Sequence, residues 1–131
     1  MRQQYHARRV GADLYVWDVH HLARLAKDMI PFNLPLDDLS ELDELWWYAD
    51  TEERPTPRSI AEHIVLMHQV DMSHPIILCA DSRLMDGMHR ALRALVEKRP
   101  LVTAVQFAAT PEPDFVNVSL DDLPYPEDRA L

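Results

Sequence analysis

The sequence predicts a small α/β (α+β) domain in which helices pack against a mixed sheet. Two apolar runs, PIILC at 75–79 and LVTAVQF at 101–107, have the length and composition of buried strands. The stretches before and between them show the spacing of apolar residues that is typical of a helix. Ten prolines and two glycines mark where these elements end. This alternation indicates the mixed fold class.

Composition fits one compact domain with a core of its own. The chain has 131 residues, of which 47% are hydrophobic and 27% charged, and it contains no internal repeat or low-complexity tract. We therefore expect a single domain over 1–131, with its core at about 30–107. Residues 1–29 are expected to form an N-terminal extension, and 108–131 an acidic, proline-rich tail.

Charge and cysteine content argue against several functional classes. The 22 acidic residues outnumber the 13 basic ones and give a net charge of −9, so repulsion from phosphates disfavours direct nucleic-acid binding. The single cysteine, Cys79, cannot form an internal disulfide and is interpreted as a small core residue. No stretch approaches the roughly 20 apolar residues that span a bilayer, and the first ten residues do not resemble a secretory signal. We expect a cytoplasmic location and no membrane association.

The first half of the chain is expected to alternate extended and helical segments. Residues 13–19 are predicted as a strand, and Asp18 can cap a following helix that ends near Met29, because its carboxylate accepts free amide hydrogens of the first turn. Residues 30–36 are predicted as an edge strand, since their two prolines lack amide donors. Residues 37–50 are predicted as an acidic turn or short helix that carries adjacent aromatic side chains.

A longer helix is predicted from Pro57 to about Val70. Thr56 can cap it with Pro57 at the first position, and a capping box of Ser59 with Glu62 is the alternative. Its apolar side chains share one broad face, on which a histidine is interpreted as a core residue. The face consists of Ile60, Ala61, Ile64, Val65, Met67 and His68.

The second half is predicted as a strand at 75–79, a brief strand at 83–85, a helix that Gly87 opens and a strand at 101–107. The buried stripe of this helix is expected to be Met88, Ala91, Leu92, Leu95 and Val96, with His89, Arg90, Arg93 and Glu97 on the other side. Apolar residues of the tail are expected to pack on the domain, namely Phe115, Val116, Val118 and Tyr125.

The corner Asp86-Gly87-Met88-His89-Arg90 is the strongest candidate site. A glycine at a strand-to-helix bend lets a bound group approach the backbone, and the first amide hydrogens of the helix are unpaired. Arg90 adds a guanidinium that can pair with phosphate through two hydrogen bonds, and His89 adds a donor whose charge can change near neutral pH. The structural alternative is that Asp86 caps the helix and that Arg90 pairs with an acid such as Glu97.

The stretch from Ser59 to Phe107 resembles the ParB/sulfiredoxin superfamily. The resemblance rests on a helix followed by HPIIL, a turn, RLMDGMHRALRAL and a closing LVTAVQF, and it covers directly about half of the chain. It implies a ParB/sulfiredoxin-like fold and a pocket for a nucleotide or phosphate at the corner. It places Gly87, His89 and Arg90 on the phosphates.

Branches of this superfamily differ in the chemistry that they imply here. Sulfiredoxins carry a nucleophilic cysteine where this chain has Met88, so reductase activity is not expected. ParB proteins continue into a DNA-binding domain for which this chain has no room. The free serine kinase branch carries Asp-Gly-x-His-Arg, the motif most similar to residues 86–90, and this similarity implies phosphoryl transfer.

Other polar residues can be interpreted either as functional or as purely structural. Arg58 can hold phosphate oxygens at the start of the helix at 57–70, or it neutralises acidic neighbours such as Glu62. Asp86 can orient Mg²⁺ or accept a proton. We expect no dedicated metal site, because neither His20 with His21 nor His63 with His68 has the spacing that puts two imidazoles on one helix face.

These observations predict binding of a nucleotide (ATP, ADP or CTP, with Mg²⁺) or another small phosphate ligand at the corner. The first hypothesis is a nucleotide-dependent phosphotransferase or hydrolase, with Asp86 and His89 as catalytic candidates. The binding candidates are Gly87, Met88, His89, Arg90 and Arg58. The alternatives are a non-catalytic nucleotide-binding regulator and a protein-interaction module with a protein partner.

Overall fold

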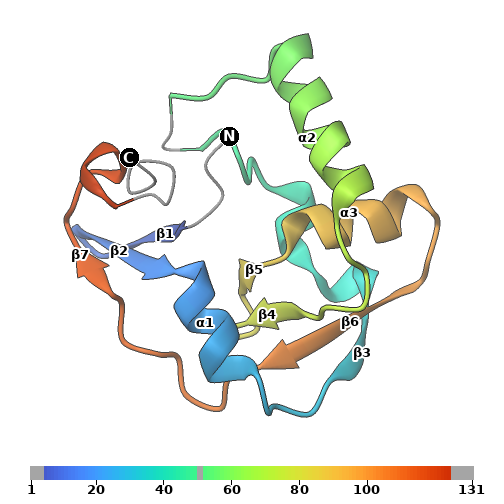
Figure 1. Cartoon of the computed structure of the whole chain (residues 1–131), viewed down its shortest axis with the longest axis horizontal. Helices are drawn as coiled ribbons and strands as arrows, with labels where there is room; N and C mark the ends of the chain where they lie inside the picture. The colour runs from blue at the N-terminus through green and yellow to red at the C-terminus, as the bar shows by residue number, and fades with distance from the viewer. Residues whose placement is uncertain (1–4, 50–51, 125–131) are drawn as a thin grey trace.

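The computed structural model describes residues 5–49 and 52–124 and shows an α+β fold with two small sheets (Figure 1). The first sheet has three antiparallel strands in the order β1-β2-β7. They are β1 (Tyr5–Val10), β2 (Asp13–Asp18) and β7 (Phe115–Val116). The predicted fold class is therefore confirmed, although the sheet is divided in two.

The second sheet holds the apolar strands that the sequence predicts. Its order is β3-β6-β4-β5, with β4 and β6 parallel and the other neighbours antiparallel. The strands are β3 (Phe32–Pro35), β4 (Ile76–Leu78), β5 (Leu84–Asp86) and β6 (Leu101–Gln106). The two prolines around β3 are tolerated because this strand lies at the edge, and every residue of the central β4 is buried.

The helices begin where their capping residues predict. In α1 (Val19–Ala26) the Asp18 carboxylate accepts the His20 amide hydrogen at 2.9 Å, and the helix ends before the expected Met29. Thr56 caps α2 (Pro57–Gln69) by accepting the Ser59 amide hydrogen at 3.2 Å. The third helix, α3 (Met88–Val96), starts directly after Gly87. Within the described residues, no helix is both long enough and apolar enough to cross a bilayer.

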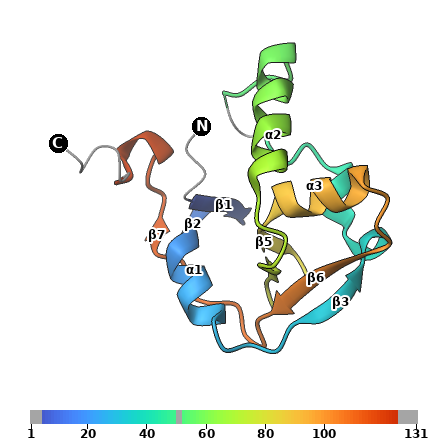
Figure 2. The same cartoon turned by 45° about the vertical axis from the view of Figure 1, so that its right-hand side comes forward.

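The predicted buried face of α2 is wrong except for Met67. The side chains that it buries are Ser59, His63 and Met67, whereas Val65 is 53% exposed and His68 lies on the surface. Figure 2 shows α2 standing clear of both sheets, and its main packing partner is α3. Because α2 contacts the rest of the protein over a narrow area, it buries only the residues that face that area. Two of these, Ser59 and His63, are polar and find partners there, whereas most of the predicted apolar face lies outside the contact.

The predicted stripe of α3 is only partly correct. Met88 and Ala91 are buried as expected, but Val96 is 57% exposed and Leu95 is also exposed, and Ala94 is buried in their place. This buried edge packs on the 3₁₀ turn at Leu36–Asp38 and on β4 and β6. Small alanine side chains let α3 lie close to the sheet, and that orientation turns its C-terminal apolar residues outward.

Residues 5–29 share a core with the second sheet instead of extending from it. Trp17, Leu22 and Ala26 belong to the same buried cluster as Ile77, Cys79, Met85, Val105 and Phe107. The sequence does not predict β1, because the polar side chains of this strand do not give an apolar strand pattern. In the tail, Phe115 and Val118 pack on the first sheet as expected, Val116 is largely exposed, and Tyr125 lies outside the described residues.

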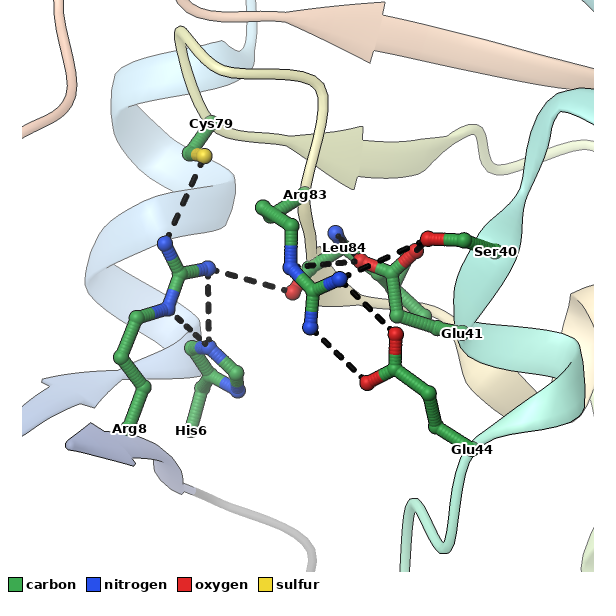
Figure 3. Close-up of polar contacts among 8 residues, drawn as sticks. All are labelled: His6, Arg8, Ser40, Glu41, Glu44, Cys79, Arg83 and Leu84. Atoms are coloured by element: carbon green, nitrogen blue, oxygen red, sulfur yellow. Dashed lines mark hydrogen bonds and ion pairs between the residues drawn. The ribbon is translucent and has the colours of Figure 1, made fainter.

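A buried carboxylate joins the acidic segment to the second sheet. Glu41, in the 3₁₀ turn Ser40–Asp43, is 1% exposed and accepts the amide hydrogen of Leu84 at 2.5 Å (Figure 3). Arg83 Nε lies 3.5 Å from the same carboxylate, and the Arg83 guanidinium also forms two hydrogen bonds with Glu44. The buried Glu41 carboxylate therefore holds the acidic segment at the first residue of β5, and it cannot move far without losing its hydrogen bond.

Removing the Glu41 carboxylate should destabilise the fold strongly. Glu41→Ala leaves the Leu84 amide without its acceptor in a buried place, so we expect a loss of about 3 kcal/mol in the free energy of unfolding. Urea denaturation followed by tryptophan fluorescence measures it. Glu44→Ala is the control: its carboxylate is 41% exposed, so solvent screening should keep its cost below about 1 kcal/mol. Equal losses in the two variants would contradict the assigned role of Glu41.

Candidate functional site

A cavity of about 840 Å³ brings the predicted corner together with β1 and the turn that carries Trp46 and Trp47. All five residues of the corner line it, namely Asp86, Gly87, Met88, His89 and Arg90. The charged lining consists of Arg8, Arg9, Arg83 and Arg90 against Glu44, Glu53 and Asp86. With four cations against three anions, the cavity lining carries a net positive charge, although the whole chain has a net charge of −9.

Gly87 is required by its backbone conformation and by its neighbours. Its φ is +109°, and an added Cβ would lie 2.7 Å from Ile76 Cγ2 and 3.0 Å from an Arg90 guanidinium nitrogen. The sequence predicts that this glycine makes room for a bound group. In the structure the protein itself takes that room, with Ile76 and Arg90.

Arg90 folds back on the corner. One guanidinium nitrogen donates to the Pro75 carbonyl and to the Asp86 carboxylate, each at 3.1 Å. The side chain is 16% exposed, and within the described residues its Nε is buried without a hydrogen-bond partner. The acid that pairs with Arg90 is thus Asp86, while Glu97 pairs with Arg93.

The alternative in which Asp86 caps α3 is wrong. The capping residue is Gly87, and no side chain of the described residues accepts a hydrogen bond from the first turn as a cap. An amide hydrogen in that turn has no acceptor within the helix. The corner therefore keeps the unpaired donors that an anion needs, although the aspartate beside them is already paired.

Next to the corner, Glu53, His63 and His89 form a hydrogen-bonded chain. His63 Nδ1 lies 2.9 Å from His89 Nε2, and His63 Nε2 lies 2.7 Å from the Glu53 carboxylate. Trp47 covers both imidazoles, with ring centroids 3.7 Å from His63 and 4.8 Å from His89. The sequence does not predict this hydrogen-bonded series of three side chains. The signal that could have found it is the i, i+4 spacing of Ser59, His63 and Met67, the side of α2 that is buried.

His89 does not titrate near neutral pH as the sequence predicts. Burial lowers its pKa to about 4, and the neighbouring His63 and Arg90 act in the same direction, against an opposing effect of Glu53. The imidazole is consequently neutral at pH 7. A neutral ring has one N–H donor and one acceptor, so its role depends on which nitrogen carries the proton.

On another side of the cavity, Arg8 ties β1 to the β4–β5 hairpin (Figure 3). Its guanidinium donates to Cys79 Sγ and to the Leu84 carbonyl at 3.4 Å each, and to His6 Nε2 at 3.3 Å. Cys79 is fully buried, as a core residue should be. Burial alone would raise the pKa of this thiol, but the Arg8 hydrogen bond and two backbone amides more than offset it and lower the pKa.

His6 is a second neutral imidazole in the cavity lining. It is stacked between Trp17 and Trp46, with ring centroids at 5.7 and 5.5 Å. Burial, followed by the charges of Arg8 and Arg83, lowers its pKa to about 3.

The structure does not bring Arg58 to the corner. Arg58 is exposed beside a separate, shallower depression of about 250 Å³, together with Glu52, Glu53 and Glu62. Across residues 5–49 and 52–124, no three His, Cys, Asp or Glu side chains are grouped so that they could hold a metal ion. Comparison with protein-family models, curated proteins and solved structures found no match.

The packing at Gly87 predicts a large cost for a small substitution. Gly87→Ala should destabilise by at least about 2 kcal/mol, because the new Cβ meets the backbone of β4 and the left-handed conformation is strained. Gly11→Ala is the control: its φ is also positive but, at +62°, lies in the left-handed region that other residues enter at modest cost, and nothing lies within 4 Å of the added carbon, so about 1 kcal/mol is expected. Urea denaturation compares the two, and similar losses would show that Gly87 is not closely packed.

The buried His6 should make stability depend on pH. Its pKa is about 3 in the folded chain and about 6.5 in the unfolded chain, so below pH 6.5 the unfolded chain binds a proton that the folded chain does not. The His6 contribution to the free energy of unfolding is complete above pH 6.5 and falls by about 2 kcal/mol between pH 7 and pH 5. His6→Gln should remove this part of the slope in urea denaturation, whereas His20→Gln, at an exposed position, should leave it.

Proposed function

We propose that this chain binds a nucleotide (ATP, ADP or CTP) or another phosphate ester at the Asp86–Arg90 corner and transfers or hydrolyses its phosphoryl group. The observation that carries the proposal is the cavity, which joins the corner to three further arginines and two tryptophans. About 840 Å³ lies within the roughly 300–1,000 Å³ of small-molecule sites. Arginines suit phosphate oxygens, and tryptophans suit the flat base of a nucleotide.

The donors that support phosphate binding are those left over by the protein. Arg90 Nε is buried and lacks an acceptor among the described residues, a state that costs free energy which a phosphate oxygen would recover. The uncapped first turn of α3 offers amide hydrogens and the positive end of the helix dipole. Arg9 is exposed at the cavity, and no partner within the described residues occupies its side chain. A ligand would therefore compete with Asp86 for only part of the Arg90 guanidinium.

Mg²⁺ fits this site as an ion carried by the nucleotide. Magnesium is commonly bound by one or two carboxylates together with substrate phosphates, and Asp86 is the carboxylate at the corner. When bound, the ion would neutralise charge on the phosphate chain.

Resemblance to the ParB/sulfiredoxin superfamily, on residues 59–107, supports the same location. The second candidate is a non-catalytic nucleotide-binding regulator or a protein-interaction module. The observation that favours it is the ion pair of Arg90 with Asp86, together with the filled space above Gly87. Measuring turnover after binding separates the two.

A thermal-shift panel tests the proposal. ATP, ADP, CTP, GTP and inorganic phosphate are each added with and without Mg²⁺; a ligand at 100 times its Kd adds about 2.7 kcal/mol and raises Tm by several degrees. Arg90→Ala should abolish the shift.

Arg93→Ala is the matched control, since Arg93 lies on the same helix, pairs with Glu97 and does not line the cavity. It should keep the shift. No shift with any ligand, or equal losses in the two variants, would refute the proposed site.

A further inference from the structure

We propose that His89 is the general base of this site and accepts a proton at Nδ1, and that His63 and Glu53 are positioning residues that hold it in the tautomer required. The proposal rests on the proposed function, because it assigns the proton acceptor of the same phosphoryl-transfer reaction. It names the acceptor substrate by class: a molecule with a hydroxyl group, either an alcohol or water.

The tautomers follow from the direction of the hydrogen bonds. An ionised carboxylate only accepts, so the proton between Glu53 and His63 lies on His63 Nε2. With one proton on each imidazole, His63 Nδ1 then carries a lone pair and accepts the Nε2 hydrogen of His89. His89 Nδ1 is left unprotonated. Glu53 thereby determines, through His63, which nitrogen of His89 is basic.

His89 Nδ1 is also unpaired and not fully buried. It has no hydrogen-bond partner among the described residues, and it is absent from their buried unpaired nitrogens, of which Arg90 Nε is the example. His89 itself lines the cavity next to Arg90 and Asp86. An unpaired, incompletely buried nitrogen on a residue that lines the cavity is accessible to a hydroxyl group bound there.

This arrangement replaces the phosphate-binding role that the sequence predicts for His89. A lone pair at Nδ1 repels a phosphate oxygen, whereas it attracts the hydrogen of a hydroxyl group. His89 is neutral at pH 7, so the Nδ1 lone pair is present there; burial makes this nitrogen a weak base, and the charge of Glu53 acts against that effect. Phosphate contacts are thus left to Arg90 and the first turn of α3.

In the proposed step, one bond to phosphorus forms and one breaks. The hydroxyl proton passes to His89 Nδ1, and the hydroxyl oxygen forms a bond to the terminal phosphorus of the nucleotide. The bond from that phosphorus to its bridging oxygen breaks, and the shortened nucleotide leaves with the electron pair. The imidazolium keeps its Nε2 hydrogen on His63, where the Glu53 charge, 2.7 Å beyond, stabilises it. The Nδ1 proton then returns to water.

The tautomer can be measured without any ligand. Nitrogen NMR of the ¹⁵N-histidine-labelled chain at pH 7 should show His89 unprotonated at Nδ1 and protonated at Nε2. Glu53→Ala should mix the two tautomers, because His63 loses the acceptor that orients it. Glu52→Ala, the exposed neighbour, is the matched control and should leave the spectrum unchanged. Protonation of His89 at Nδ1 in the wild type would overturn the proposal.

Kinetics with the nucleotide that stabilises the wild type provide the second test. His89→Gln should bind that nucleotide with a similar thermal shift but lose about 100-fold or more in kcat, as general bases contribute. Glu53→Ala should lose about tenfold in kcat with KM unchanged, and Glu52→Ala should lose nothing. Binding without any effect of His89→Gln on turnover overturns the base and leaves the proposed binding intact. Absence of binding defeats the proposed function and with it the base, whatever tautomer is found.

Discussion

The hydrogen bond from the Leu84 amide to the buried Glu41 carboxylate is the constraint on which the cavity depends. It holds the acidic segment at the start of β5, two residues before the corner at Asp86. The turn that follows this segment carries Trp46 and Trp47, which cover the imidazoles of His6 and His89. A buried carboxylate is costly unless its hydrogen bonds are met, so this place has little freedom to shift. Together with the contacts of Arg83 to Glu41 and Glu44, this hydrogen bond fixes the spacing of two walls of the cavity.

Local signals are sufficient to predict most elements. Asp18 and Thr56 cap the helices that they are predicted to cap, and the apolar run at 75–79 becomes the central β4, because each depends on a few neighbouring residues. The buried side of α2 cannot be predicted this way. Which face of a helix is covered depends on its partners, and α2 meets little besides α3 and the aromatic turn. In β1, polar residues are explained only by partners distant in the sequence, such as Cys79 for Arg8.

The candidate site likewise has features that contiguous residues predict and features that depend on distant partners. Residues 86–90 are contiguous, so the sequence predicts that they form one corner, and all of them line the cavity. Their partners are not contiguous with them. Arg90 pairs with Asp86 and the Pro75 carbonyl, and His89 with a histidine from α2, so that each loses part of the role expected from its chemistry alone. Arg58 fails for the converse reason: its helix is predicted, but the direction of its side chain is not.

The pair of Asp86 with Arg90 also bears on the kind of anion that the corner can select. A carboxylate ligand would offer Arg90 no more than Asp86 already does, and it would have to displace a partner held four residues away at the end of β5. A phosphate carries more charge and more acceptor oxygens, so in the proposed site it would bind the amide hydrogens of the first turn while Asp86 keeps its nitrogen of Arg90. If the corner binds an anion as proposed, the Asp86 carboxylate would therefore disfavour carboxylate ligands more than phosphates.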